Sequence, residues 1–175
     1  MEIYKTFETE RLLIRPTQIE DAAFVLQLLN TPKWIEFIGD RNVKTLDDSI
    51  KYIENRMLPQ LHRLGYSNNT IILKATQQKI GSIGLYDREV LDGVDIGFAF
   101  LPTFENKGYA FEASVCLLDA AHLNFGINTV SAITSKNNIS SQKLIEKLGL
   151  KLEGKITLPN EHEELLLYKI TDLVK

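Results

Sequence analysis

The residues with the clearest chemical potential form a short segment around Gly108. A strand-like run ends at Pro102, a polar loop follows, and Gly108 begins a stretch of helical composition. The first amides of a helix have no partners within it, and the helix dipole places partial positive charge there. Gly108 lets the backbone approach a ligand closely, and Lys107 adds a full charge beside it. The segment suits a phosphate or pyrophosphate, while a simple tight turn explains the glycine equally well.

Two common phosphate motifs do not describe this loop. The sequence lacks the Gly-Lys-Ser/Thr of a P-loop, and a dinucleotide fingerprint needs three spaced glycines where this loop has one. The ligand class must therefore come from other residues.

Carboxylates that could act as bases occur in two places. Asp95 lies on an expected strand, where burial beside a cleft would raise its pKa and make it a proton acceptor. A salt bridge at a strand edge accounts for Asp95 about as well. Before the last expected strand, Glu161, Glu163 and Glu164 form an acidic cluster, which is typical of a solvated face but could also attract a cationic substrate.

The remaining reactive side chains have simpler explanations. Cys116 lies on the apolar face of a predicted helix, which favours a packed thiol over a nucleophile. The three histidines are dispersed and lack metal-ligand spacing, so we expect no metal. Trp34 follows the first predicted helix and is more often a core residue than a binding one.

Composition narrows the class of protein. The chain has 175 residues, of which 44% are hydrophobic and 25% charged, and we expect a single domain over residues 1–175. A net charge of −3 argues against nucleic acid as the main ligand. One cysteine, the lack of a signal-peptide pattern in residues 1–9 and the lack of a long apolar run together predict a cytoplasmic protein that does not bind membranes.

Hydrophobic periodicity predicts an α/β fold with a mixed, mostly antiparallel central sheet and flanking helices. Helices are expected over residues 19–29, 45–61, 108–124 and 140–148. The first should stop at Asn30-Thr31-Pro32, residues 65–69 should form a turn, and the third should be buried almost all round. Strands are expected over residues 12–15, 70–74, 79–86, 94–101, 129–134, 150–153 and 164–171.

The chain resembles the GNAT acetyltransferases, whose pyrophosphate loop has the pattern Gln/Arg-x-x-Gly-x-Gly/Ala. Gly108 and Ala110 match that pattern, whereas Glu105 stands where Gln or Arg is usual. Residues 107–113 are similar to the ribosomal-protein N-acetyltransferase-like branch, with Glu105-Asn106 in place of its Trp-Gly. Further similarities occur, in the same order, at residues 8–16, 80–84, 95–98 and 138–150.

The resemblance implies where acetyl-CoA would bind. In this family two middle strands splay apart and pantetheine lies between them. That implies main-chain contacts from Phe98, Ala99 and Phe100, with Asn138 hydrogen-bonding pantetheine or supporting the strand. The pyrophosphate would be held along the loop, by Glu105, Asn106, Lys107, Gly108, Tyr109 and Ala110.

The resemblance also implies candidate catalytic and acceptor residues. Asp95 stands where the branch often has a glutamate, which suggests a general base. The usual proton-donating tyrosine is replaced by Ile145, so Ser141 is the remaining candidate to assist the leaving thiolate, although it equally suits a helix cap. Trp34 and Glu164 fall in regions that border the acceptor pocket in relatives.

The expected function is therefore transfer of an acetyl group from acetyl-CoA to a primary amine, either a protein N-terminus or a small molecule. A non-catalytic acetyl-CoA sensor or interaction module is the alternative, because the tyrosine is missing and Glu105-Asn106 is unusual. Relatives suggest a monomer or a homodimer.

Overall fold

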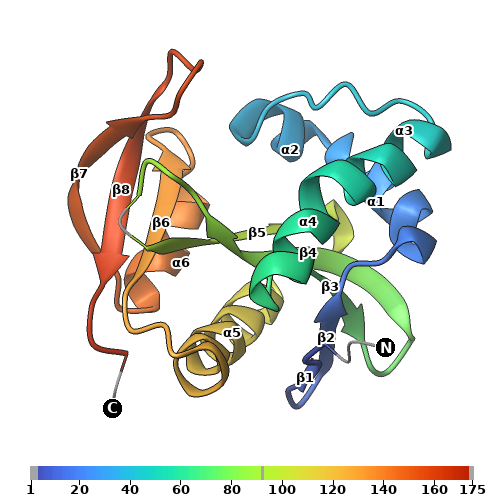
Figure 1. Ribbon diagram of the computed structural model, residues 1–175, viewed down its shortest axis with the longest axis horizontal. Helices are drawn as coiled ribbons and strands as arrows, with labels where there is room; N and C mark the ends of the chain where they lie inside the picture. Colours follow the sequence, from blue (N-terminus) through green and yellow to red (C-terminus); the bar gives the residue numbers. More distant parts are fainter. Residues whose placement is uncertain (1–3, 92, 174–175) are drawn as a thin grey trace.

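The computed structural model describes residues 4–91 and 93–173, which form one eight-stranded sheet with helices on both faces (Figure 1). The strands follow the order β1-β2-β3-β4-β5-β6-β8-β7, and only the β5–β6 pair is parallel. Their bounds are β1 Phe7–Glu8, β2 Leu12–Pro16, β3 Asn68–Leu73, β4 Gln78–Asp87, β5 Val94–Phe100, β6 Val130–Ser135, β7 Lys151–Thr157 and β8 Glu164–Ile170. The expected mixed, mostly antiparallel α/β architecture is confirmed.

Helices α1 to α4 gather over one face of the sheet, and α5 crosses the other (Figure 1). Their bounds, with those of the shorter turns, are η1 Ile19–Asp21, α1 Ala22–Leu29, α2 Pro32–Phe37, α3 Leu46–Tyr52, η2 Ile53–Met57, α4 Leu58–Leu64, η3 Pro102–Phe104, α5 Tyr109–Phe125 and α6 Ile139–Lys147. Each layer has its own buried cluster. Ile83, Ile96 and Leu117 lie in the cluster under α5, and Val25, Leu28 and Ile53 lie in the one under α1 to α4.

Two expectations about helix ends differ from the structure. Pro32 does not merely stop the first helix but begins α2, because the first helical position needs no backbone N–H. The helix expected over residues 45–61 begins as predicted with a capping box, in which Thr45 and Asp48 bond each other's backbone amides. It then passes through a π-helical turn, η2, before α4.

Two expectations about burial are also wrong. Helix α5 is not buried all round, since Leu123 is 76% exposed and Val115 39% exposed on its outer side. Asn68 and Asn69 are not part of a turn but begin β3, where both side chains are buried and hydrogen-bonded.

Strands β5 and β6 separate soon after they meet. Only Val94 opposite Val130 and Asp95 opposite Ser131 are paired, whereas β5 continues to Phe100 with β4 as its neighbour. The splayed middle strands implied by the resemblance are therefore present. One edge of β5 is left without a strand partner within the described residues.

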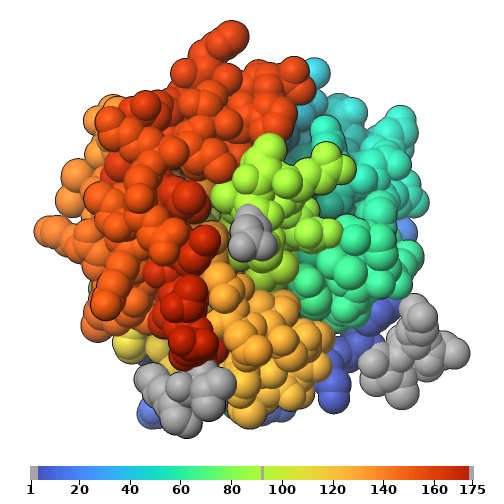
Figure 2. Space-filling view, turned by 60° about the vertical axis from the view of Figure 1, so that its left-hand side comes forward, coloured from blue at the N-terminus to red at the C-terminus, as the bar shows by residue number. Residues whose placement is uncertain are grey.

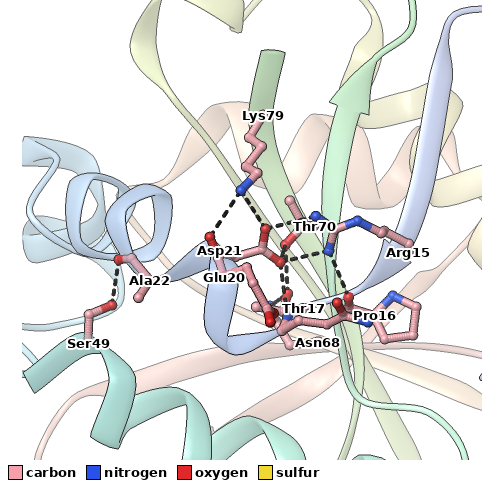
Figure 3. Close-up of polar contacts among 11 residues, drawn as sticks. Arg15, Pro16, Thr17, Glu20, Asp21, Ala22, Ser49, Asn68, Thr70 and Lys79 are labelled. Carbon is pink, nitrogen blue, oxygen red and sulfur yellow. Dashed lines mark hydrogen bonds and ion pairs between the residues drawn. The ribbon is translucent and has the colours of Figure 1, made fainter. Parts of the chain in front are cut away.

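A buried carboxylate ties the helical layer to the sheet. Asp21 is fully buried, receives two hydrogen bonds from Arg15 at 2.8 and 2.9 Å and pairs with Lys79 at 2.7 Å (Figure 3). Burial alone would raise the pKa of Asp21, but the hydrogen bonds from Arg15 and Lys79 outweigh it and hold the pKa well below its ordinary value.

A chain of hydrogen bonds leads from the middle of the sheet to Asp21. The amide of Asn68 donates to the Thr17 hydroxyl at 2.8 Å, and the Thr70 hydroxyl donates to Asp21 at 3.0 Å. The two threonine hydroxyls are 2.9 Å apart, so Thr17 must donate to Thr70. Every donor in this chain therefore points toward the negative charge, an arrangement in which each bond strengthens the next.

The substitution Asp21→Asn should lower the free energy of unfolding by about 3–5 kcal/mol, because it leaves Arg15 and Lys79 without their buried partner. Since the folded pKa of Asp21 is lowered, its contribution is full above the unfolded pKa and declines as pH falls toward the folded value. Urea unfolding at pH 7 and at pH 3 measures both effects. Asp47→Asn, which breaks an exposed pair with Lys51, is the control and should change stability by less than about 1 kcal/mol. Equal effects of the two variants would contradict this role.

Candidate active site

The free edge of β5 presents backbone groups in alternation. The amide of Leu101 donates to Ile80 of β4, and backbone N–H and C=O groups point to opposite sides at successive residues of a strand. The main-chain groups of Phe100, Phe98 and Ile96 consequently face the gap that β6 leaves. The expectation for Ala99 needs correction, because its main chain faces β4. Ile96, which the sequence analysis did not name, joins Phe98 and Phe100 among the residues whose main chain faces the gap. A single sequence does not reveal which residues of a strand face which neighbouring strand.

The gap leads to the start of α5. Gly108 precedes the helix with φ of 80°, a left-handed conformation suited to glycine, and Asn106 also has positive φ. The amide of Glu112 makes the first helical bond, to the Gly108 carbonyl, so the amides just before it are free for a ligand. Tyr109 and Ala110 are the first two residues of α5. The loop singled out by the sequence therefore has the geometry of an anion site at a helix N-terminus.

The helix start is held by the N-terminal hairpin. Glu112 accepts hydrogen bonds from the Thr9 hydroxyl at 2.5 Å and from the Arg11 backbone and side chain. Arg11 also donates to the Lys107 carbonyl at 2.9 Å. Although Glu112 is partly buried, these bonds hold its pKa below the ordinary value. The sequence analysis identified residues 8–16 and residues 107–113 as separate segments, and in the structure they are in contact.

Glu105 has a cationic partner in helix α2. Its carboxylate forms a salt bridge with Lys33 of α2. The carboxylate that replaces the family's usual Gln or Arg is thus neutralised by a residue far away in the sequence. This contact also links α2 to the loop before α5.

Asp95 is a buried carboxylate at the point where β5 and β6 part. It is 2% exposed, and Arg88 donates to it through Nε at 2.6 Å. Burial raises the pKa of Asp95, and Arg88 opposes this rise without cancelling it. The salt bridge expected for Asp95 is present, and its raised pKa is compatible with a base, which stays a prediction.

A tyrosine missed by the sequence analysis lies next to Asp95 on the same face. A side chain at Gly84 or Gly97 would collide with the Tyr86 ring, which shows that the ring lies across both glycines. The Tyr86 hydroxyl donates to Asn68 at 2.6 Å, and burial raises its pKa. Tyr86 thereby joins the sheet face at Asp95 to the chain of bonds that ends at Asp21. The sequence signal for this arrangement was Gly84, two residues before Tyr86 on β4, together with Gly97 on the paired strand β5.

Helix α6 borders the other side of the gap. The side chain of Asn138 accepts a hydrogen bond from the Ser141 amide at 3.3 Å and so caps the helix, which leaves its expected contact with pantetheine to the amide nitrogen. Ser141 is partly exposed in the first turn, whereas Ile145 is buried in the core. No proton donor is available at the position of Ile145.

The two expected acceptor residues lie apart. Trp34 of α2 is partly buried against the cluster under α1 to α4, and its indole nitrogen is buried without a hydrogen-bond partner among the described residues. Glu164 starts β8 and pairs with Lys136 at 2.5 Å and Lys155 at 3.0 Å. These pairs lower the pKa of Glu164 and offset its charge.

Three further findings concern metal ligands, the cysteine and membrane spans. Residues 4–91 and 93–173 contain no group of three or more histidine, cysteine or acidic side chains arranged to hold a metal ion. Burial raises the pKa of Cys116, which keeps it a thiol. None of the described helices has the length and apolarity to cross a membrane.

Comparison with known families decides the class. The family described as "Acetyltransferase (GNAT) domain" matches this chain over residues 11–151. The matched region includes the open edge of β5 and the loop at Gly108. This chain belongs to the GNAT acetyltransferases. It is an acyltransferase of a family that uses acetyl-CoA.

Relatives and solved structures agree with this membership. The chain is 26% identical over 146 residues to a Bacillus subtilis protein named "uncharacterized N-acetyltransferase YnaD", with 83% of this chain and 82% of the relative covered. A GNAT-family acetyltransferase from Bacillus anthracis superposes with a TM-score of 0.79 at 25% identity, covering 95% and 98% of the two chains. RimL, a ribosomal L7/L12 α-N-protein acetyltransferase solved with coenzyme A, has the same fold, with a TM-score of 0.82 at 15% identity and coverage of 98% and 100%.

Asp95→Asn should make the GNAT domain more stable at pH 8, in contrast to Asp21→Asn. The folded pKa of Asp95 is raised, so its stabilising contribution is present below the unfolded pKa and is lost as pH rises through the folded value. The neutral amide does not undergo this loss, and Arg88 is exposed enough to be hydrated. Urea unfolding of both proteins at pH 8 and pH 3.5 should show a gap at the higher pH that narrows at the lower one. A loss of stability at pH 8 would show that Arg88 compensates the charge fully.

Proposed function

We propose that this protein transfers the acetyl group of acetyl-CoA to a primary amine, as an enzyme of the cytoplasm acting as a monomer or homodimer. The observation that carries the proposal is the combination of an unpaired edge of β5 with a glycine that precedes the start of α5. The chain resembles the ribosomal-protein N-acetyltransferase-like branch, and the proposed acceptor is a protein N-terminus or a small amine.

Acetyl-CoA would bind through main-chain groups. We assign pantetheine to the free edge at Ile96, Phe98 and Phe100, and the pyrophosphate to the loop and first helical amides from Glu105 to Ala110. An amide on the β5 edge would also stabilise the oxyanion that develops on the acetyl carbonyl. Asn138 would contact pantetheine from the opposite wall of the gap.

The transfer requires two proton movements. Asp95 would take a proton from the acceptor ammonium, directly or through water, and the amine nitrogen would then attack the acetyl carbonyl. The amine nitrogen gives up its second proton as the amide forms and the C–S bond breaks, and the departing CoA thiolate gains a proton. Ser141 would assist this last step by hydrogen-bonding the sulfur, and a weak donor suffices because a thiol has a pKa of about 8.5. Trp34 and Glu164 are proposed to border the acceptor.

Thermal unfolding with acetyl-CoA tests the binding site directly. A ligand at 100 times its dissociation constant stabilises a protein by about 2.7 kcal/mol, which for a chain of this size predicts a rise in melting temperature of roughly 5–11 °C. Gly108→Glu should abolish the rise in melting temperature, because the glutamate side chain would fill the space that the pyrophosphate needs and would repel its charge. ATP serves as a second ligand and should give a smaller rise.

A matched control lies at the other end of the same helix. Gly126 follows α5 with φ of 67°, so Gly126→Glu introduces the same charge and similar backbone strain away from the loop. This variant should retain the rise with acetyl-CoA. If both variants lose it, or if ATP gives an equal rise in the wild type, the loop is not the acetyl-CoA site. Release of CoA in the presence of a panel of amines then separates an enzyme from a sensor, which would bind without turnover.

Lys33→Met should weaken acetyl-CoA binding by about threefold to tenfold, the order expected from one uncompensated charge near an anion. The reason is that Glu105 would lose its partner and repel the pyrophosphate. The double variant Lys33→Met, Glu105→Gln removes both charges and should recover most of the affinity. Lys51→Met, on exposed α3, is the control. Titration calorimetry with acetyl-CoA measures all four proteins, and similar values for Lys33→Met and Lys51→Met would disprove the repulsion.

A further inference from the structure

Arg88 is the side chain that links the buried carboxylate of Asp95 to the surface. The side chain of Asp95 is 3% exposed, whereas that of Arg88, which donates to it at 2.6 Å, is 38% exposed. Arg88 thus bridges the buried carboxylate and the surface. Among the residues that the structure describes, the guanidinium contacts Asp95 and the Tyr86 ring, whose centroid is 5.9 Å away.

The outer side of Arg88 faces an open cleft. The cleft lies between the loop after β4 and the turn between β7 and β8, and it is an open hollow of about 260 Å³. It is lined by Arg88, Glu89, Val90, Leu158, Pro159 and Glu161. In Figure 2 the yellow-green segment around β5 is bordered by the orange-red C-terminal strands on one side and by the teal helices α3 and α4 on the other.

The charges of the cleft are arranged by depth. Two exposed carboxylates, Glu89 and Glu161, stand on its lining, Arg88 lies on its inner wall, and the carboxylate of Asp95 lies behind Arg88. An entering cation meets negative charge at the lining and at the end of the path. The one cation lining the cleft is a side chain, free to swing outward on its flexible stem.

We propose that Arg88 occupies, in the free protein, the place that the ammonium group of the acceptor takes on Asp95, so that acceptor binding exchanges one cation for another at this carboxylate. The acceptor is accordingly a primary alkylammonium, and a second positive charge in it improves binding through Glu89 and Glu161. This inference deepens the proposed function and rests on it for the role of Asp95.

Pairing with Arg88 favours the ionised form of Asp95 in the free protein and opposes the effect of burial. An isolated buried carboxylate is costly, and removing one partner of a buried charge pair leaves the other unpaired. Arg88 limits that cost until an acceptor arrives. The apparent affinity for the acceptor is reduced by the fraction of molecules in which Asp95 is already occupied.

The test compares Arg88→Met with Arg88→Lys and with Arg63→Met. Arg63 of α4 pairs on the surface at 2.8 Å with Asp87, the last residue of β4, so its substitution removes the same charge from a site near Arg88. The acceptors are 1,5-diaminopentane and 1-aminopentane at pH 8, with saturating acetyl-CoA and CoA release as the readout. For Arg88→Met we expect the KM of both amines to fall about tenfold, which corresponds to 90% occupancy of Asp95 by Arg88. The kcat should change less than twofold, because a saturating amine displaces Arg88 in the wild type too.

The control variants show whether a change in KM comes from the loss of the cation beside Asp95 or from the loss of any nearby surface charge. Arg88→Lys keeps a cation and Arg63→Met leaves the cleft unaltered, so both should retain the wild-type KM. Glu161→Gln should raise the KM of the diamine more than that of the monoamine. If KM is unchanged or higher in Arg88→Met, Arg88 does not compete with the acceptor and the proposal falls.

A second readout does not depend on catalysis. Arg88→Met should melt at a lower temperature than wild type if Asp95 is left unpaired, and 1,5-diaminopentane should restore the melting temperature where 1-pentanol does not. This result would support the exchange even if no amine were acetylated, whereas its absence in a folded variant would overturn it. Failure of the wild type to release CoA with any amine would contradict the proposed function alone.

Discussion

The separation of β5 from β6 after two paired residues is the constraint on which the rest of the site depends. A strand edge inside a protein needs hydrogen-bond partners, because unpaired backbone groups away from water are costly. Here the edge at Ile96, Phe98 and Phe100 is left open beside α5 and α6. The fold thereby keeps a place for an extended ligand that pairs as a strand would. The adjoining start of α5 supplies charge of the sign that a pyrophosphate needs.

The two buried aspartates show how the same side chain serves opposite purposes. Asp21 has two cations and several hydrogen bonds, so its ionised form is strongly favoured. Asp95 has one partner and a pKa that burial keeps raised. The first stabilises the junction of helices and sheet, whereas the second lies where burial disfavours its charged form. The chain of donors from Tyr86 to Asp21 runs between them along one sheet face.

Sequence reasoning succeeded where a local pattern determines the structure. The capping box at Thr45 and Asp48, the strands on either side of the loop and the glycine before α5 were all predictable from neighbouring residues. It failed where distant segments decide. The Lys33–Glu105 pair, the Arg11–Glu112 contact and the orientation of Ala99 toward β4 depend on packing and register that one sequence does not contain. Trp34 is only partly buried and packs against the cluster under α1 to α4, and the partners of Glu164 could not be foreseen from the sequence.

The strand order at the C-terminal side of the sheet has a consequence for folding during synthesis. β7 is made before β8, yet its pairing partner in the described sheet is β8, which lies between it and β6. During translation β7 therefore has no strand partner from the synthesis of Thr157 until that of Ile170, the last residue of β8. At about 5–20 residues per second this interval lasts about 1–3 s. The short strand is protected meanwhile by its alternating lysines and glutamate, which are the kind of side chains that discourage pairing with another nascent chain.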